Sequence, residues 1–430
     1  MGLGKTLQAL AALLALRAQR EKPGPSLVVC PASVAHNWNR EAHRFAPDLR
    51  VLVLEKGKER EALLRRLDEY DLVIKNYALT RRDIERLRRY EWLMVCVDEA
   101  QAIKNAESAI ARAVKSLKAE CRFALTGTPI ENRLSDLCSI AEFVAPGYLP
   151  SLESLERLGT ESGPKALNRM LRSRLRPILM RRMKSEVAPE LPERIEERLD
   201  CEMTHGQRRA YAAEMKAARA LLHGLKDKGR EAGQGRIRIL AALTRLRQIC
   251  CDPSLLGIQN AGSGKIEALN ELLPRLMENG HKTLVFSQFV RMLERIQVHL
   301  DALGIPYRTL TGKTSNRLDL VDEFESDSNP SVFLISLKAG GTGLNLTSAS
   351  HVILFDPWWN PAVEAQAIDR AHRIGQDKTV VAFRLAALDS IEERILELQE
   401  KKRSLVEGIL EEEAFNRALT RDDFAFLLEG

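Results

Sequence analysis

The sequence lacks the features that hold small secreted domains or membrane proteins together. It has 7 cysteines in 430 residues, and none are spaced as Cys-x-x-Cys or with the His/Cys pattern of a zinc site. This usage indicates a reducing compartment and argues against a disulfide framework or a structural zinc. No apolar run approaches the roughly 20 residues that a membrane-spanning helix needs, so no membrane partner is expected.

Neither sign of charge dominates the chain. The formal net charge is +6, which is compatible with nucleic-acid binding but does not demonstrate it. Hydrophobic residues make up 45% of the chain and charged residues 29%, an ordinary globular composition. The length is sufficient for two or three hydrophobic cores.

One continuous apolar run, Leu93 to Val97, ends in two adjacent carboxylates, Asp98 and Glu99. Such a run is typical of a buried strand in a parallel sheet, and open α/β sheets bind ligands at the carboxyl ends of their strands. One carboxylate there could hold Mg²⁺, and the other could orient or deprotonate an attacking water. Taken alone, the pair is better explained as solvated acids at a strand end or as a helix cap, and only the motifs that follow favour a catalytic site.

The chain begins with Gly2-Leu3-Gly4-Lys5-Thr6, followed by an apolar helical stretch. Glycines allow backbone N–H groups to close on phosphates, Lys5 would reach the β- and γ-phosphates, and the Thr6 hydroxyl would bind Mg²⁺. A signal peptide is a weaker interpretation, because the phosphate loop explains the same residues better. The match to G-x-x-x-x-G-K-[ST] is partial, since the first glycine and a preceding strand are absent.

Strand-like and helix-like stretches alternate along two parts of the chain, which predicts an α/β fold with two parallel sheets. We expect a first lobe at 1–145, incomplete at its start, helical insertions and a linker at 146–262, and a second lobe at 263–430. The arginines between Arg169 and Lys184 are interpreted as a solvated helix face. Gly262-Ser263-Gly264-Lys265 resembles a phosphate loop but lacks its first glycine and strand, so we interpret it as a hinge loop. Strands are expected at 26–31, 50–54, 70–74, 93–98, 121–125, 282–287, 307–310, 332–336, 352–356 and 380–383.

Three further segments follow predicted strands or helices. Thr126-Gly127-Thr128 could be an ordinary turn, but beside Asp98 and Glu99 a coupling segment is favoured. The glycine-rich loop from Gly340 to Asn345 could let backbone approach phosphates closely. Arg370 and Arg373 are spaced as one helical turn and could clamp a transferring phosphoryl group, although a surface salt-bridge face is the alternative.

Taken together, these motifs resemble the Swi/Snf-type ATPases of helicase superfamily two, in the prokaryotic form with Asp-Glu-Ala-Gln. The resemblance covers nearly the whole chain, and the motifs occur in the family's order. The matching segments are Met1–Gln8, Asp98–Gln101, Leu125–Asn132, Leu284–Phe289, Gly340–Leu346, Asp356–Pro361 and Gln366–Gln376.

The resemblance implies two tandem RecA-like lobes with ATP and Mg²⁺ between them. Glu99 would act on water, Thr6 and Asp98 on the metal, and Arg370 and Arg373 as arginine fingers. The residues implied to bind the nucleotide are Gly2, Gly4, Lys5, Thr6, Asp98, Gln366, Gly341 and Gly343. Those implied to contact DNA are Pro31, Trp38, Thr126, Thr128, Thr342, Asn345 and Trp358. For two of the three tryptophans Trp38, Trp358 and Trp359, buried packing is the alternative.

The resemblance further implies an ATP-dependent translocase on double-stranded DNA, remodelling DNA-bound proteins in a prokaryotic cytoplasm at the nucleoid. Two alternatives remain: a strand-separating helicase of the same superfamily, and a non-hydrolysing DNA-binding fragment. The family's first strand and glutamine segment are not found in this sequence. We therefore expect residues 1–430 to be an amino-terminally truncated form that hydrolyses ATP poorly, because an unanchored phosphate loop must pay ordering entropy to bind.

Overall fold

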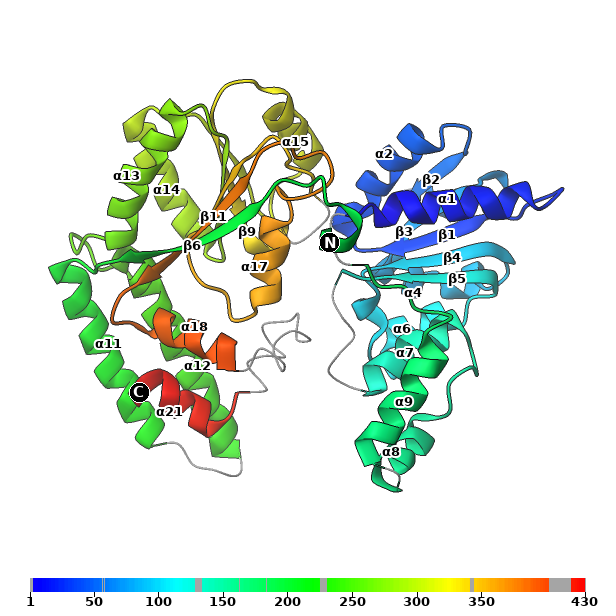
Figure 1. Ribbon diagram of the computed structural model, residues 1–430, viewed down its shortest axis with the longest axis horizontal. Coiled ribbons are helices and arrows are strands. Elements are labelled where there is room, and N and C mark those ends of the chain that lie inside the picture. Colours follow the sequence, from blue (N-terminus) through cyan, green and yellow to red (C-terminus); the bar gives the residue numbers. More distant parts are fainter. Residues whose placement is uncertain are drawn as a thin grey trace. The chain divides into compact units, whose positions relative to one another are not determined.

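The computed structural model describes residues 3–55, 57, 59–127, 134–161, 163–182, 184–224, 230–340, 344–401 and 419–429. The chain forms two compact units, Met1–Pro189 and Glu190–Gly430, and each has its own sheet (Figure 1). Among the helices of the described residues, none combines the length and the hydropathy that crossing a bilayer requires.

The first unit contains a five-stranded parallel sheet in the order β2-β3-β1-β4-β5. Every strand lies where the apolar runs predicted it, so this part of the fold prediction is confirmed. The strands are β1 (Ser26–Cys30), β2 (Val51–Leu54), β3 (Leu72–Asn76), β4 (Trp92–Asp98) and β5 (Ala119–Leu125).

Helices cover both faces of this sheet, which is why its central strands are apolar on both sides. Val28 and Cys30 pack in one core with α1 (Lys5–Ala18) and α2 (Ala35–Phe45). Leu27 and Val29, on the opposite face of β1, pack with α6 and α7. The remaining helices of the unit are α3 (Arg60–Leu63), α4 (Tyr77–Arg82), α5 (Ile84–Leu87), α6 (Ala109–Lys115), α7 (Leu134–Val144), α8 (Leu152–Glu161), α9 (Gly163–Leu175) and α10 (Lys184–Val187).

The second unit contains a six-stranded parallel sheet in the order β6-β11-β10-β7-β9-β8. The prediction of two parallel-sheet lobes is therefore confirmed. The strands are β6 (Arg194–Cys201), β7 (Thr283–Ser287), β8 (Tyr307–Leu310), β9 (Val332–Ser336), β10 (His351–Leu354) and β11 (Val380–Ala387). Helices α13 (Gly264–Glu278) and α14 (Val290–Leu303) cover one face, and α15 (Arg317–Ser326), α16 (Leu337–Gly340) and α17 (Pro361–Ile368) cover the other.

Strand β6 corrects the expectation that 146–262 holds only helices and a linker. It pairs in parallel with β11 along its whole length, so the second unit begins at Glu190 and not near residue 263. Helices α8, α9 and α10 belong to the first unit. The strand was missed because it lies at the edge of its sheet with most residues exposed, so it contains no apolar run.

A separate helical core adjoins the β6–β11 side of the second unit. It is formed by α11 (His205–His223), α12 (Arg230–Cys251), α18 (Ile391–Lys401) and α21 (Arg421–Glu429). Helix α21 packs against α11 and α18, which brings the end of the chain next to the segment after β6 (Figure 1). Two helices of the region predicted as helical insertions and a linker, α11 and α12, therefore supply the partner surface for the carboxyl-terminal helices.

Candidate nucleotide site

Polar side chains meet at the carboxyl edge of the first sheet. The register places Val97 of β4 beside Val29 of β1, and Asp98 beside Leu125 of β5. Because all these strands are parallel, the residues that follow them emerge at the same edge. Asp98 ends β4, and Thr126 directly follows β5. The acidic pair and Thr126 of the predicted coupling segment therefore lie at the same edge.

The carboxylate of Asp98 is fixed by donors on both oxygens. Its Oδ1 accepts the backbone N–H of Glu99 at 2.9 Å, and its Oδ2 accepts the indole N–H of Trp38 at 2.9 Å. Burial raises the pKa of Asp98 above its ordinary value, and the charge of Glu99 adds to this; the Trp38 hydrogen bond and the charge of Lys5 act in the opposite direction. A nearby cation stabilises the ionised form of a carboxylate that burial disfavours in this way.

Glu99 has a backbone conformation that is rare for its residue type, with φ 54° in the left-handed region. The Tyr77 hydroxyl donates a hydrogen bond of 2.7 Å to the carbonyl of Asp98, directly before this turn. Residues in such conformations are concentrated at functional sites, and here the left-handed conformation turns the chain away from the strand direction immediately after Asp98.

A chain of side-chain hydrogen bonds links the ends of β4 and β5. The amide of Gln101 donates to Glu99 Oε2 at 2.8 Å, and the Thr126 hydroxyl donates to Gln101 Oε1 at 3.2 Å. Thr126 is thus connected to Glu99 through Gln101. The sequence motifs predict a role for Thr126 but none for the side chains of Gln101 and Tyr77. Tyr77 could have been noticed because it follows β3 at the same edge.

The amino terminus of α1 approaches this edge. Lys5 begins the helix directly after Gly4, whose φ of 69° lies in the left-handed region. Helix α1 contacts β4, and the positive charge of Lys5 acts to lower the pKa of Asp98. Thr6 is half-buried in the first turn of α1. The lysine cation and the helix amino terminus suit the phosphates of a nucleotide, and the carboxylate suits its Mg²⁺.

In the second unit, the two predicted arginine fingers are not on a helix. Helix α17 ends at Ile368, so Arg370 and Arg373 lie in the turns that follow it, which corrects the one-turn spacing. Arg373 Nη1 donates to the carbonyl of Leu344 at 3.2 Å, and the backbone N–H of Leu346 donates to the carbonyl of Arg370 at 3.0 Å. The arginine turns are thus held against the segment that continues the glycine-rich loop.

The remaining predicted site residues are either half-buried in their units or outside the described part of the chain. Gln366 is half-buried on α17, and Pro31, Thr126 and Asn345 are half-buried in their units. The residues that lie outside the described part of the chain are Gly2, Thr128, Gly341, Thr342 and Gly343.

The two tryptophans proposed to touch DNA are core residues. Trp38 is 1% exposed and Trp358 is 5% exposed. Trp38 packs between α1 and the sheet, and Trp358 packs in the core formed with α15, α16 and α17. Their side chains offer no surface to a base or sugar in either unit, so the buried alternative replaces the DNA-contact prediction for both.

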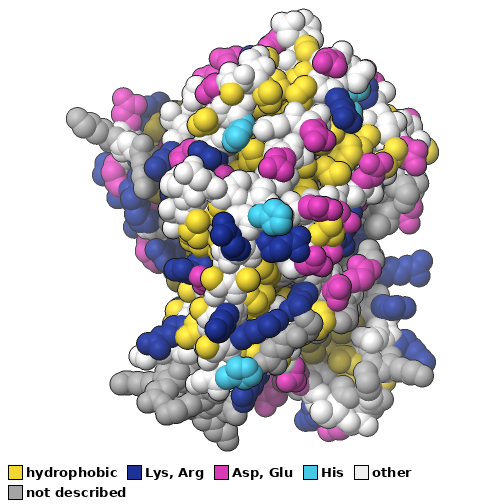
Figure 2. Space-filling model, turned by 90° about the vertical axis from the view of Figure 1, so that its left-hand side faces the viewer, with side chains coloured by type: hydrophobic (Ala, Val, Ile, Leu, Met, Phe, Trp, Pro, Cys, Tyr) yellow, Lys and Arg dark blue, Asp and Glu magenta, His cyan; other side chains and the backbone are white. Residues whose placement is uncertain are grey.

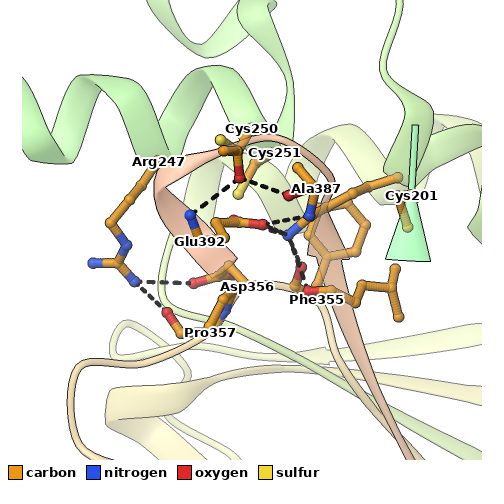
Figure 3. Close-up of polar contacts among 12 residues, drawn as sticks. Cys201, Arg247, Cys250, Cys251, Phe355, Asp356, Pro357, Ala387 and Glu392 are labelled. Atoms are coloured by element: carbon orange, nitrogen blue, oxygen red, sulfur yellow. Dashed lines mark hydrogen bonds and ion pairs between the residues drawn. The ribbon is translucent and has the colours of Figure 1, made fainter. Parts of the chain in front are cut away.

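The segment Gly262-Ser263-Gly264-Lys265 is not a hinge. Ser263 caps α13, and the Nζ of Lys265, which is fully buried, lies 2.7 Å from Glu392 Oε2 and donates to the carbonyl of Phe355 at 2.8 Å. Figure 3 shows Glu392 beside Ala387, with Arg247 reaching toward Asp356 and Pro357. Lys265 therefore ties α13 to α18 and to the end of β10.

Replacing Lys265 by Met is expected to destabilise the second unit by about 3–5 kcal/mol, because it leaves the buried carboxylate of Glu392 without its cation. Urea unfolding followed by circular dichroism measures this change. The exposed Lys313→Met variant is the control for the loss of one charge. The double variant Lys265→Met with Glu392→Gln should recover part of the loss. An unchanged unfolding midpoint in the single variant would contradict the structural role of the pair.

Two parallel α/β units, the first with a lysine and an acidic pair at the carboxyl edge of its sheet, define the class of two-lobed helicase-like proteins. Comparison with protein families agrees with this assignment. The SNF2-related domain matches residues 1–255, and the helicase conserved C-terminal domain matches residues 264–375. The chain belongs to the SNF2-related family.

Similar proteins come from bacteria, eukaryotes and archaea. An uncharacterized ATP-dependent helicase of Mycoplasma pneumoniae is 37% identical over 100% of this chain and 41% of its own length. The SWI/SNF-related matrix-associated actin-dependent regulator of chromatin subfamily A member 1 of Homo sapiens is 34% identical over 94% of this chain and 40% of its own length. The chain thus spans less than half the length of these curated relatives.

A solved structure, the Sulfolobus solfataricus SWI2/SNF2 ATPase core in complex with dsDNA, is also similar. Its sequence is 34% identical, and the match covers 100% of this chain and 91% of that chain with a TM-score of 0.47.

Proposed function

We propose that this protein is an ATP-driven translocase on double-stranded DNA that remodels protein–DNA complexes in the prokaryotic nucleoid. The observation that carries the proposal is the meeting of Lys5, Asp98, Glu99 and Gln101 at one edge of the first sheet. Membership of the SNF2-related family supports it. Mg²⁺ bound with ATP supplies charge neutralisation of the phosphates.

Each residue has a distinct role in this proposal. Lys5 and the amino terminus of α1 bind phosphate, while Thr6 and Asp98 hold the metal. Glu99 orients and deprotonates the attacking water, and its hydrogen bond to Gln101 fixes the carboxylate for that task. Gly4 gives the backbone a left-handed turn before the helix.

The second unit would supply Arg370 and Arg373, together with Gln366 and the glycines Gly341 and Gly343, to the nucleotide. Their guanidinium groups would stabilise the charge that develops on the transferring phosphoryl group, as arginine fingers do. The hydrogen bond from Arg373 to the carbonyl of Leu344 lies within the second unit. Hydrolysis would then require closure of the two lobes.

DNA binding is proposed to rest on backbone phosphates, with Pro31, Thr126, Thr128, Thr342 and Asn345 nearby. Figure 2, which faces the second unit from the left of Figure 1, shows basic, acidic and hydrophobic side chains interspersed. In the sequence, the proposed contacts come after β1 and β5 or lie in the glycine-rich loop from Gly340 to Asn345.

DNA affinity is expected to depend strongly on salt and weakly on sequence, because phosphate contacts release counterions when they form. Fluorescence anisotropy with several unrelated duplexes at a series of salt concentrations measures both properties. The logarithm of the affinity should fall linearly with the logarithm of the salt concentration, with the same slope for each duplex. Sequence-specific binding that is insensitive to salt would contradict the proposal.

Translocation and strand separation give different products. A triplex-displacement assay detects movement along a duplex, and a forked-duplex assay detects unwinding. Displacement of the third strand without unwinding is expected; unwinding would favour the alternative of a strand-separating helicase.

A further inference from the structure

Trp38 contributes a buried donor to the site from a different element. It lies on α2 with Ala35 and Ala42, and these three residues form the buried stripe of a helix whose other face is polar. The stripe packs against α1 and the central strands, so the indole lies in the core of the first unit. Its N–H is directed to Asp98, which is 60 residues away in the sequence.

We propose that Trp38 is a positioning residue for the metal-binding carboxylate of Asp98. This inference rests on the proposed function, because it takes Asp98 as a ligand of Mg²⁺. The indole N–H and the backbone N–H of Glu99 each hold one oxygen of the carboxylate at 2.9 Å. Together they fix its plane and leave a second lone pair on each oxygen for a cation or its water ligands.

This arrangement is the usual way in which proteins tune a metal ligand. Hydrogen-bond partners of ligating carboxylates orient them, and removing such a partner typically weakens metal affinity by about 10- to 100-fold. The role is specific to the indole N–H, because a phenyl ring at position 38 would still fill the core between α1, α2 and the sheet. If the role of Trp38 were purely structural, its hydrogen bond to Asp98 would serve only to give the buried indole N–H a partner.

A second tryptophan in the same unit provides a matched control. Trp92 is also 1% exposed and also donates its indole N–H, to the carbonyl of Leu87 at 3.0 Å. It begins β4, at the opposite end of the strand from Asp98. Trp38→Phe and Trp92→Phe therefore remove the same group from buried positions of the same unit, on opposite faces of its sheet, but only Trp38 touches the carboxylate.

The test is the affinity for Mn²⁺, used as a paramagnetic substitute for Mg²⁺, in the presence of ADP, measured by electron paramagnetic resonance. Trp38→Phe should weaken Mn²⁺ binding by about 10- to 100-fold, whereas Trp92→Phe should leave it unchanged. Affinity for ADP without metal should be the same in both variants. ATP hydrolysis by Trp38→Phe should recover at high Mg²⁺ concentration.

Two additional variants keep the result interpretable. If Trp38→Phe fails to fold, 3-benzothienylalanine at position 38 keeps the ring shape and removes only the N–H donor, and it should give the same loss of Mn²⁺ affinity. Unchanged Mn²⁺ affinity in either position-38 variant would overturn the positioning role. Asp98→Asn separates this from the proposed function: normal Mn²⁺–ADP binding by that variant would overturn the metal assignment itself.

Discussion

Replacing Glu99 by Gln is expected to stop ATP hydrolysis while leaving ATP binding intact. The substitution keeps the size of the side chain and removes the base that would activate water. Its amide oxygen can still accept the hydrogen bond that Gln101 donates to Glu99 Oε2, so the local geometry should persist. Loss of a positioned general base typically costs about 10²–10⁴-fold in rate.

Single-turnover phosphate release and the affinity for a fluorescent ATP analogue separate the two effects of Glu99→Gln. Glu107→Gln is a suitable control, because Glu107 is an exposed acid of the same unit outside the strand edge. Its rate should equal that of the unaltered protein. Near-normal turnover by Glu99→Gln would remove Glu99 from the proposed mechanism.

Arg373→Ala should slow hydrolysis by about 10³–10⁵-fold, the range found for arginine fingers. The effect follows from the charge that develops on the phosphoryl group in the transition state. DNA affinity should change little, because it depends on many phosphate contacts spread over the surface. The variant also loses the hydrogen bond to the carbonyl of Leu344, and circular dichroism would verify that the fold persists.

Arg245→Ala is the matched control, since it removes the same charge from the second unit. Arg245 is an exposed residue of α12 whose guanidinium pairs with Glu214 at 2.9 Å. Hydrolysis and DNA affinity should both remain close to normal in this variant. A large loss of DNA affinity with normal hydrolysis in Arg373→Ala would instead assign Arg373 to the DNA.

The buried strands could be predicted from the sequence because strands that are covered on both faces consist almost entirely of apolar residues. Strands β1, β4 and β9 are covered on both faces and are continuous apolar runs. Strand β6 has the opposite character: it lies at an edge, and its only strand partner among the described residues is β11, almost two hundred residues later. Nothing local distinguishes such a strand from a polar linker.

The same contrast applies to the site. The positions of Asp98 and Glu99 at the end of β4 and of Lys5 at the start of α1 were predictable because each lies at the end of a recognisable element. Trp38 and Lys265 were misassigned because their roles depend on distant partners, Asp98 in one case and Glu392 in the other.

The turn after α17 was also misjudged from local spacing. The helical pattern of the sequence continues through Arg373, but helix α17 ends at Ile368. Tertiary hydrogen bonds hold the residues that follow. His372 is hydrogen-bonded to the carbonyl of Pro192, and the Gln376 amide donates to the carbonyl of Ala349. A sequence window of one helical turn contains none of these partners, so their effect could not be predicted.

The rate of phosphate release from ATP, with and without saturating duplex DNA, tests the central claim most directly. The measurement is made in the presence of Mg²⁺. We predict slow hydrolysis without DNA and a large stimulation by duplex DNA of any sequence. Absence of hydrolysis, or hydrolysis that duplex DNA does not change, would contradict the claim that the acidic edge of the first sheet is a DNA-dependent ATPase site.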